Sequence, residues 1–123
     1  MSVQREEQED LPAEVVIKKI RAGEAVLVDV REPREFAFER IHGALLHPLS
    51  TFEPRAMPKT TEQVIIFHCG SGKRSRKALE AFKAATGRAG LHMAGGLGQW
   101  KAAGFPTIKI NPATGDVEDS GRF

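Results

Sequence analysis

The sequence lacks the features that would place the protein in a membrane or an oxidising compartment. It has one cysteine among 123 residues, which excludes an internal disulfide framework and suits a reducing compartment. The opening stretch MSVQREEQED has no apolar run, so we expect no signal peptide. No stretch approaches the roughly 18 apolar residues of a membrane-spanning helix. We therefore expect a cytoplasmic protein without a membrane partner.

The sequence also lacks an excess of charge of one sign. The formal net charge is +2, and both signs are spread along the chain. Aromatic residues are not interleaved with the basic ones, so we expect no nucleic-acid partner. His42, His47 and His92 are scattered and do not form a set of zinc ligands, so we expect no metal site. Nothing in the chain indicates a cofactor.

What the sequence does have is a regular alternation of short apolar runs and helical patterns. The length and a hydrophobic fraction of 41% suit one domain with a proper core. Strands alternating with helices predict an α/β domain with a mostly parallel sheet. We expect strands at residues 25–30, 44–49, 64–68, 91–94 and 108–110, and helices at 11–22, from 32 onward, at 75–86 and at 95–104.

Only the two ends look too polar to pack. Residues 1–10 are acidic and predict a flexible N-terminus, with Asp10 capping the first helix and Pro12 in its first turn. The folded domain is then expected to span residues 11–110. The Gly, Asp, Glu and Ser content of residues 111–123 favours a disordered tail.

The single cysteine lies in the stretch HCGSGKRS, directly after the clearest predicted strand. Ligands of parallel sheets bind at the carboxyl ends of strands, and Cys69 is at such an end. Gly70 and Gly72 let the loop curl its N–H groups inward as an anion-binding nest. The following helix start, Lys73 and Arg74 add positive charge. These groups favour the thiolate and predict a lowered pKa for Cys69, which could then act as a nucleophile without a partner base.

Alternatives remain for three groups in this region. A buried, inert role for Cys69 is the general rule for free cysteines, but the two glycines and two cations argue against it. His68 should face away from Cys69, because neighbouring strand residues point to opposite faces, and this favours a structural histidine. Asp29 and Arg31, at the end of the first expected strand, could be catalytic or could form an ion pair that braces a loop.

Three separated stretches resemble the rhodanese (sulfurtransferase) family. DVREPREFAFERIHGALLHPL at 29–49 is similar to the family's Asp-Val-Arg, Glu-Phe/Tyr and Ile-x-Gly-Ala series, although Glu39 and Arg40 replace its usual Gly-His. CGSGKRS at 69–75 resembles its Cys-x-x-Gly-x-Arg loop, and GGLGQWKAAGFP at 95–106 resembles its Gly-Gly, Trp and Gly-Pro segment. Their order and spacing make the combination specific.

The resemblance implies a fold and a reaction. The fold is a single rhodanese-like domain, with a central, mostly parallel sheet of about five strands flanked by helices on both faces. In the ping-pong reaction, the Cys69 thiolate takes a sulfur from a small anionic donor and passes it, as a persulfide, to cyanide or a thiol. Thiosulfate is the expected donor, with mercaptopyruvate as the alternative. The implied donor-binding residues are Gly70, Ser71, Gly72, Lys73, Arg74 and Ser75, with Asp29 and Arg31 in support.

Three other functions fit parts of the pattern. A non-enzymatic persulfide carrier, docking to a sulfur-relay protein, would have almost the same sequence. A non-catalytic interaction domain is disfavoured because Cys69 and both loop cations are present. Phosphatases and arsenate reductases of the same fold place five residues between Cys and Arg, whereas four separate Cys69 from Arg74. The shorter loop suits one sulfur atom better than a tetrahedral phosphate.

Overall fold

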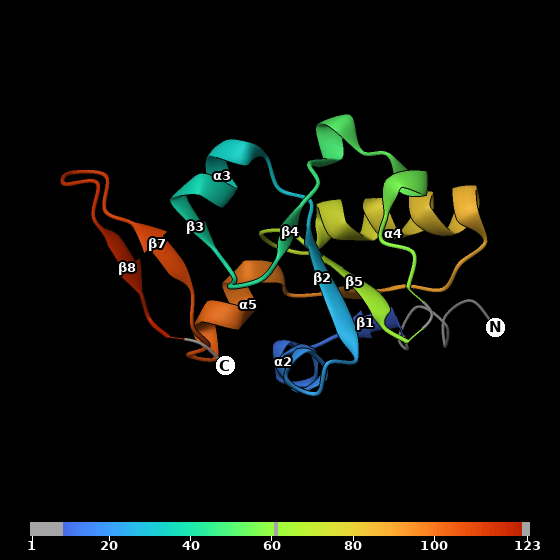
Figure 1. The fold of residues 1–123 in the computed structure, drawn as a ribbon, viewed down its shortest axis with the longest axis horizontal. Helices are drawn as coiled ribbons and strands as arrows, with labels where there is room; N and C mark the ends of the chain where they lie inside the picture. The colour runs from blue at the N-terminus through green and yellow to red at the C-terminus, as the bar shows by residue number, and fades with distance from the viewer. Residues whose placement is uncertain (1–8, 61, 122–123) are drawn as a thin grey trace.

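The centre of the protein is a five-stranded parallel sheet (Figure 1). The computed structural model describes residues 9–60 and 62–121. The strands follow the order β1-β6-β5-β2-β4, and each neighbouring pair is parallel. They are β1 (Asp10–Leu11), β2 (Ala25–Asp29), β4 (Leu45–Leu46), β5 (Val64–His68) and β6 (Leu91–Met93). The predicted α/β class with a parallel sheet of about five strands is confirmed.

Helices cover both faces of this sheet, as the sequence predicts. They are α2 (Ala13–Arg21), α4 (Lys73–Thr86) and α5 (Gly96–Ala102), whereas α3 (Pro33–Phe38) lies against residues 39–40 and 108–110. On one face, Ile17 of α2 and Trp100 of α5 share a buried cluster with Ile66. On the other face, Phe82 of α4 packs edge-on against Phe67. Successive residues of β5 thus serve opposite cores, because strand side chains alternate between faces.

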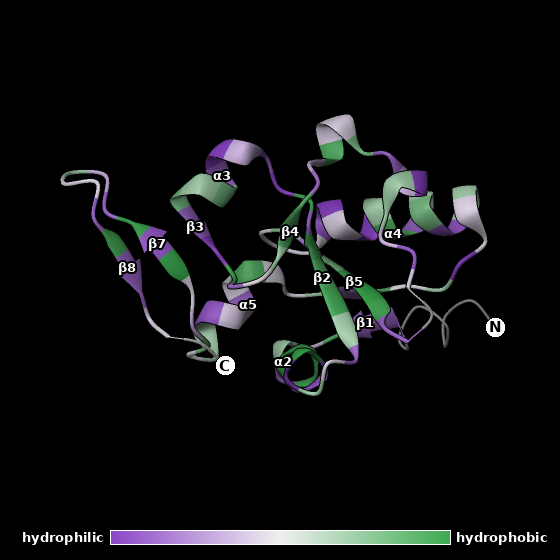
Figure 2. Ribbon diagram, in the orientation of Figure 1, coloured by the Kyte–Doolittle hydropathy of each residue, from purple (hydrophilic) through white to green (hydrophobic). Residues whose placement is uncertain are grey.

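The strands in the middle of the sheet are apolar because both of their faces are covered. Figure 2 shows β2 and β5 as largely hydrophobic, whereas the helices carry hydrophilic residues on their outer sides. A near-continuous apolar run is typical of a parallel strand that is buried on both faces. Among the described residues, no helix is both long enough and apolar enough to cross a membrane.

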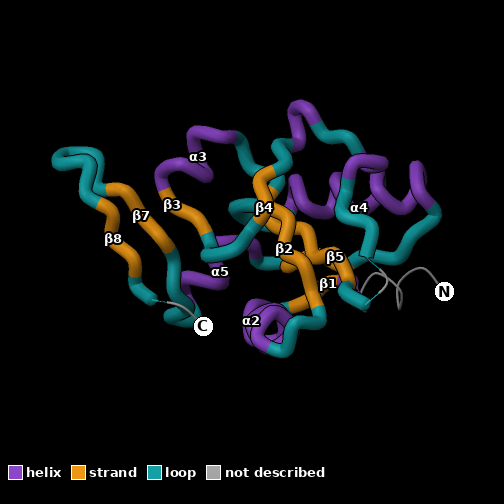
Figure 3. Tube along the Cα trace, in the orientation of Figure 1, coloured by secondary structure: helices purple, strands orange, loops and turns teal. Residues whose placement is uncertain are grey.

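A second, smaller sheet lies beside the first (Figure 3). It is antiparallel, in the order β3-β7-β8. Its strands are β3 (Glu39–Arg40), β7 (Ile108–Ile110) and β8 (Val117–Asp119). The tail expected to be disordered therefore contains a strand. The sequence pattern did not indicate this strand because all three residues of β8 are exposed and polar or isolated in the pattern. The strand is formed by backbone pairing with β7.

The N-terminal edge also differs from expectation. Asp10 does not cap the first helix; it lies in β1, where its register partner is His92 of β6. α2 begins at Ala13, and Pro12 takes the N-cap position without a side-chain cap. Pairing with β6 competes with helix formation here, and the chain turns into the helix only at the proline. The flexible N-terminus is predicted for residues 1–10; Asp10 is instead ordered in β1, and residues 1–8 lie outside the described part of the chain.

Candidate active site

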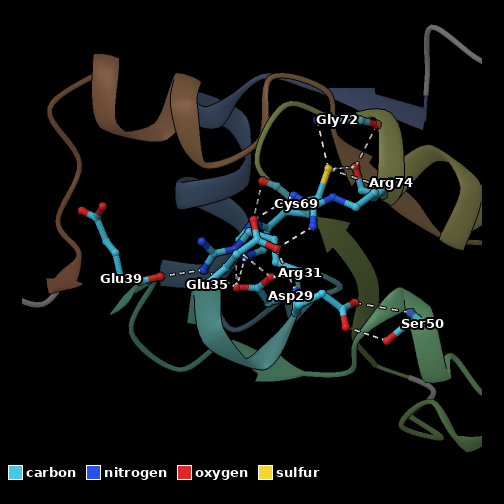
Figure 4. A network of polar contacts seen from close by, with 11 residues as sticks. Asp29, Arg31, Glu35, Glu39, Ser50, Cys69, Gly72 and Arg74 are labelled. Atoms are coloured by element: carbon cyan, nitrogen blue, oxygen red, sulfur yellow. Dashed lines mark hydrogen bonds and ion pairs between the residues drawn. The ribbon is translucent and has the colours of Figure 1, made fainter. Parts of the chain in front are cut away.

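Cys69 lies at the carboxyl end of β5, at the base of a tight loop that leads into α4 (Figure 4). Its sulfur accepts hydrogen bonds from the backbone N–H groups of Gly72, at 3.0 Å, and Ser75, at 3.4 Å. The Ser75 hydroxyl oxygen is 3.6 Å from the same sulfur. The cysteine is only 1% exposed. The loop therefore wraps a single sulfur atom with donors, as its glycines predict.

These donors change the acidity of the thiol. Burial alone would raise the pKa of Cys69, because a thiolate loses solvation in the interior. Hydrogen bonds from the backbone and side chain of Ser75, together with the amide of Gly72, outweigh burial and lower the pKa below its usual value. The direction is the one predicted from the sequence. The cause is local hydrogen bonding to the sulfur.

The curl of the loop depends on Gly72. This residue has a φ of 101°, in the left-handed region, and it forms the N-cap of α4. A Cβ atom at this position would lie 1.9 Å from the carbonyl oxygen of Ala94. The same turn starts α4 at Lys73, two residues before the predicted start at Ser75. Only glycine fits both the backbone angle and the close approach to Ala94.

The two loop cations have different surroundings. Arg74 makes a bidentate ion pair with Glu35 of α3, with Nη1–Oε1 and Nη2–Oε2 distances of 2.6 and 3.0 Å. Hydrogen bonds from Arg74 lower the pKa of Glu35 to about 2. Lys73, in contrast, is exposed at the start of α4. Arg74 therefore ties the loop to α3, and Lys73 is directed toward solvent.

Glu35 is itself held by the start of its helix. Its side chain accepts a hydrogen bond from the backbone N–H of Glu32, which completes a capping box. Glu32 in turn accepts the hydroxyl hydrogen bond of Ser50, at 2.6 Å. Figure 4 shows these contacts running from the loop to Ser50. The position of Arg74 is therefore fixed through three segments of the chain.

Asp29 and Arg31 form a buried ion pair beneath the loop. The guanidinium Nη2 lies 2.8 Å from Asp29 Oδ2 and also donates to the carbonyl of Glu39, at 2.6 Å. Nε2 of His68 lies 3.4 Å from Asp29 Oδ2, outside hydrogen-bond geometry. Burial would raise the pKa of Asp29, but His68 and Arg31 outweigh it and hold that pKa well below its ordinary value. These contacts match the alternative in which Asp29 and Arg31 form an ion pair that braces a loop.

His68 faces away from the thiol, as its place on the strand predicts. It is a register partner of Asp29 in the parallel sheet. Cys69 packs instead in the cluster on the α4 side of the sheet. A direct Cys–His pair between adjacent residues is therefore not formed here.

The start of α5 holds the loop from the opposite side. The backbone N–H of Leu97 donates to the carbonyl of Cys69 at 2.8 Å, and that of Gly98 donates to the carbonyl of Gly70 at 3.1 Å. Gly96 has a φ of 59°, and a Cβ there would lie 2.5 Å from the carbonyl oxygen of Cys69. The glycines of the third resemblance stretch therefore act by letting α5 approach the loop closely.

A shallow depression of about 520 Å³ opens beside the loop. Lys73, Arg76 and Lys77 place three cations around it, and the exposed Ser71 lies on its loop side. Positive charge at such a rim favours the approach of small anions.

Sequence reasoning missed two residues that contact the loop: Glu35, through Arg74, and His92, through Ser75. His92 of β6 lies 2.9 Å from the Ser75 hydroxyl through its Nδ1, and its Nε2 lies 2.8 Å from Asp10 Oδ1. His92 was set aside because it has no partner at metal-ligand spacing. Recognising β1 as a strand beside β6 would have placed Asp10 next to His92. β1 has only two residues, however, which is too short to be recognised from the sequence. In the described residues, no group of three His, Cys, Asp or Glu side chains is arranged to hold a metal ion.

Comparison with known proteins identifies the family of this chain. The model of the rhodanese-like domain family matches residues 12–103. The chain belongs to this family. Among curated proteins, it is 40% identical over 98 residues to the uncharacterized protein slr1261 of Synechocystis. That match covers 79% of this chain but 55% of the relative, so the chain spans about half the length of that protein.

Solved rhodanese-like structures have the same fold. The human single-domain sulfurtransferase TSTD1 is 26% identical, with a TM-score of 0.66 and coverage of 76% of this chain and 96% of that one. A Rhodopseudomonas palustris protein of unknown function, described as a possible tyrosine phosphatase, is 25% identical, with a TM-score of 0.67. That match covers 80% of this chain and 83% of the other. The similar solved structures thus include one described as a sulfurtransferase and one described as a possible phosphatase.

Proposed function

We propose that this rhodanese-like protein is a sulfurtransferase that uses Cys69 as its nucleophile and thiosulfate as its donor. The observation that carries the proposal is the set of donors around one sulfur atom. Two backbone N–H groups and the Ser75 hydroxyl lie within 3.6 Å of the Cys69 sulfur. They stabilise a thiolate and would equally stabilise the terminal sulfur anion of a persulfide. Similarity to a human single-domain sulfurtransferase supports the same chemistry.

The first half-reaction forms the persulfide. The Cys69 thiolate attacks the outer sulfur of thiosulfate and forms a new S–S bond. The S–S bond of thiosulfate breaks, and its electron pair leaves with sulfite. The negative charge then resides on the outer sulfur of Cys69, where the loop N–H groups can donate to it. No proton has to move in this step.

The second half-reaction releases the sulfur. Cyanide, or a thiolate acceptor, attacks the outer sulfur of the persulfide and forms thiocyanate or a new persulfide. The S–S bond to Cys69 breaks, its electron pair returns to the cysteine, and the thiolate is regenerated. Each half-reaction has one substrate and one product, which is a ping-pong scheme.

Loop cations would act differently on the donor. We assign Lys73, which is exposed at the depression, to attraction of the anionic donor. Because Arg74 is engaged by Glu35, we assign it to holding the loop closed. A phosphatase of this fold needs its arginine to bind phosphate oxygens, so the bidentate Arg74–Glu35 pair favours sulfur transfer over phosphate hydrolysis.

The test is the intact mass of the protein after incubation with thiosulfate. Wild type should gain the mass of one sulfur atom, and addition of cyanide should remove it with release of thiocyanate. Cys69→Ser should show no gain, because the serine hydroxyl stays protonated and is a poor nucleophile. Circular dichroism of the variant would verify that its fold is intact.

Other outcomes would point to the alternatives. Loading by thiosulfate without repeated turnover with cyanide indicates a carrier that delivers its sulfur to a relay protein. If mercaptopyruvate loads the protein and thiosulfate does not, the donor is mercaptopyruvate. Thiocyanate production by Cys69→Ser at the wild-type rate would contradict the assignment, and hydrolysis of an aryl phosphate without any sulfur loading would favour a phosphatase.

A further inference from the structure

A chain of hydrogen bonds connects the buried thiol of Cys69 to the protein surface. The cysteine sulfur lies 3.6 Å from the Ser75 hydroxyl oxygen, which lies 2.9 Å from His92 Nδ1. The other ring nitrogen of His92, Nε2, lies 2.8 Å from Asp10 Oδ1. The four residues come from the loop, α4, β6 and β1. Residues far apart in the sequence are therefore aligned on one path.

Exposure increases sharply at the outer end of this path. Cys69 is 1% exposed, Ser75 0% and His92 3%. The side chain of Asp10 is 41% exposed. Asp10 and His92 both line the depression beside the loop. The thiol has almost no direct contact with solvent, so this path offers its proton a route to the surface.

The hydrogen-bond partners fix which atoms carry protons. The Asp10 carboxylate forms an ion pair with Arg76, so its oxygen acts as an acceptor for His92. Nε2 of His92 must then carry the ring proton, which leaves Nδ1 of a neutral ring as an acceptor. The Ser75 hydroxyl can donate to Nδ1 and accept from the Cys69 S–H group. The carbonyl of Gly72, 3.1 Å away, is the other acceptor within reach of Ser75.

Charged groups face His92 from two elements. Asp10 and the preceding Glu9 favour its protonated form from the N-terminal edge, and Arg76 of α4 disfavours it. Burial is the largest effect, and it lowers the pKa of His92 below the ordinary value. The ring is therefore neutral before the reaction, with a carboxylate placed to stabilise the positive charge that protonation would create.

We infer that His92 is a positioning residue that takes the proton of Cys69 through Ser75. The Cys69 S–H proton moves to the Ser75 oxygen, and the Ser75 hydroxyl proton moves to Nδ1 of His92. The products are a thiolate, a neutral serine now donating to it, and an imidazolium held by Asp10. Charge and protons balance within the four residues. The inference deepens the proposed function, since it supplies the nucleophile that the sulfur transfer needs.

The test measures the ionisation of Cys69 without using any sulfur donor. The chain has one cysteine, so the rate of alkylation by iodoacetamide as a function of pH reports on Cys69 alone. We expect His92→Asn, whose amide can still bond Ser75 but cannot titrate in this range, to move the midpoint upward by about one pH unit. Ser75→Ala should move it in the same direction. His42→Asn, the same substitution at a site beside Asp119, is the matched control and should leave the midpoint unchanged.

A second measurement examines the coupling from the other side. The titration of His92 can be followed by NMR before and after alkylation of Cys69. Because linkage is reciprocal, removal of the thiolate charge should lower the titration midpoint of His92. Unchanged midpoints in both experiments, with variants that remain folded, would overturn the inference. A shifted midpoint without sulfur loading would uphold the proton path and refute the sulfurtransferase. Sulfur loading with unshifted midpoints would uphold the sulfurtransferase and refute the proton path.

Discussion

At the scale of single residues, the active-site loop is held by an ion pair, Arg74 with Glu35, that does not involve the thiol. Arg74 lies between Gly72 and Ser75, whose N–H groups bind the Cys69 sulfur, yet its own guanidinium binds Glu35. A buried or half-buried arginine fork is suited to this because its two N–H edges match a carboxylate. The pair holds the loop and α3 together in one geometry, and the amides stay oriented toward the sulfur.

Acid should weaken this connection in a defined range of pH. The pKa of Glu35 is lowered from 4.5 to about 2 in the folded protein, so its stabilising effect is complete above about 4.5 and is lost as the pH falls toward about 2. We therefore expect Glu35→Gln to lower the thermal midpoint at neutral pH. The difference from wild type should shrink steadily below about pH 4.5. A difference that stays constant down to the lower limit would contradict an ion-pair origin.

At the scale of elements, α5 acts as a support for the loop as well as part of the core. Trp100 fills the core on its inner side, and the N–H groups at its first turn bind the carbonyls of Cys69 and Gly70. Gly96 makes this approach possible because it has a positive φ and no side chain. The loop is thus held between two helix starts, α4 on one side and α5 on the other.

Replacing Gly96 should therefore reduce the reactivity of Cys69 more than it reduces the stability of the fold. Gly96→Ala would bring a methyl group to 2.5 Å from the Cys69 carbonyl oxygen and force the loop to shift. A displacement of this kind should lower the rate of persulfide formation by roughly tenfold to a hundredfold. Gly104→Ala is the matched control, since its φ of 80° carries similar strain but nothing lies within 4 Å of the added atom. Equal loading rates in the two variants would show that α5 does not position the loop.

At the scale of the whole molecule, the protein divides into a reactive sheet and a smaller accessory sheet. The loop, its supports and the proton path all belong to the parallel sheet and its helices. The accessory sheet joins them through β3, where Glu39 accepts from Arg31 by its carbonyl and from Thr107 by its carboxylate. β8 is one step further out, since it pairs only with β7.

Removal of residues 111–123 should accordingly spare the chemistry. β8 contributes three register pairs with β7 and exposed side chains, so its loss should cost about 1 kcal/mol of unfolding free energy. In thermal unfolding this corresponds to a decrease of roughly 5 °C in the midpoint. Sulfur loading at Cys69 should keep its wild-type rate. A truncated protein that fails to load while remaining folded would show that the hairpin takes part in the site.

The sequence predicts the parts of this protein that depend on local pattern. Apolar runs located β2, β5 and β6, and the glycines and cations after Cys69 predicted the donor-rich loop. The parts that it does not predict depend on residues that are distant in the chain. Arg74 and Glu35 are 39 positions apart, and His92 and Asp10 are 82 apart. β1 and β3 have two residues each, which is too short for any periodicity to be visible.

The short edge strand β1 has a dynamic consequence. Its backbone pairs with β6, and the ion pairs of Glu9 and Asp10 with Arg76 fasten it to α4. Two paired residues at a sheet edge should open at a lower free energy than the sheet as a whole, so we expect this edge to unfold locally on its own. On the proton path inferred above, such an opening would hydrate His92 and separate it from Asp10. The reactivity of the thiol would then follow a fluctuation at the edge of the domain.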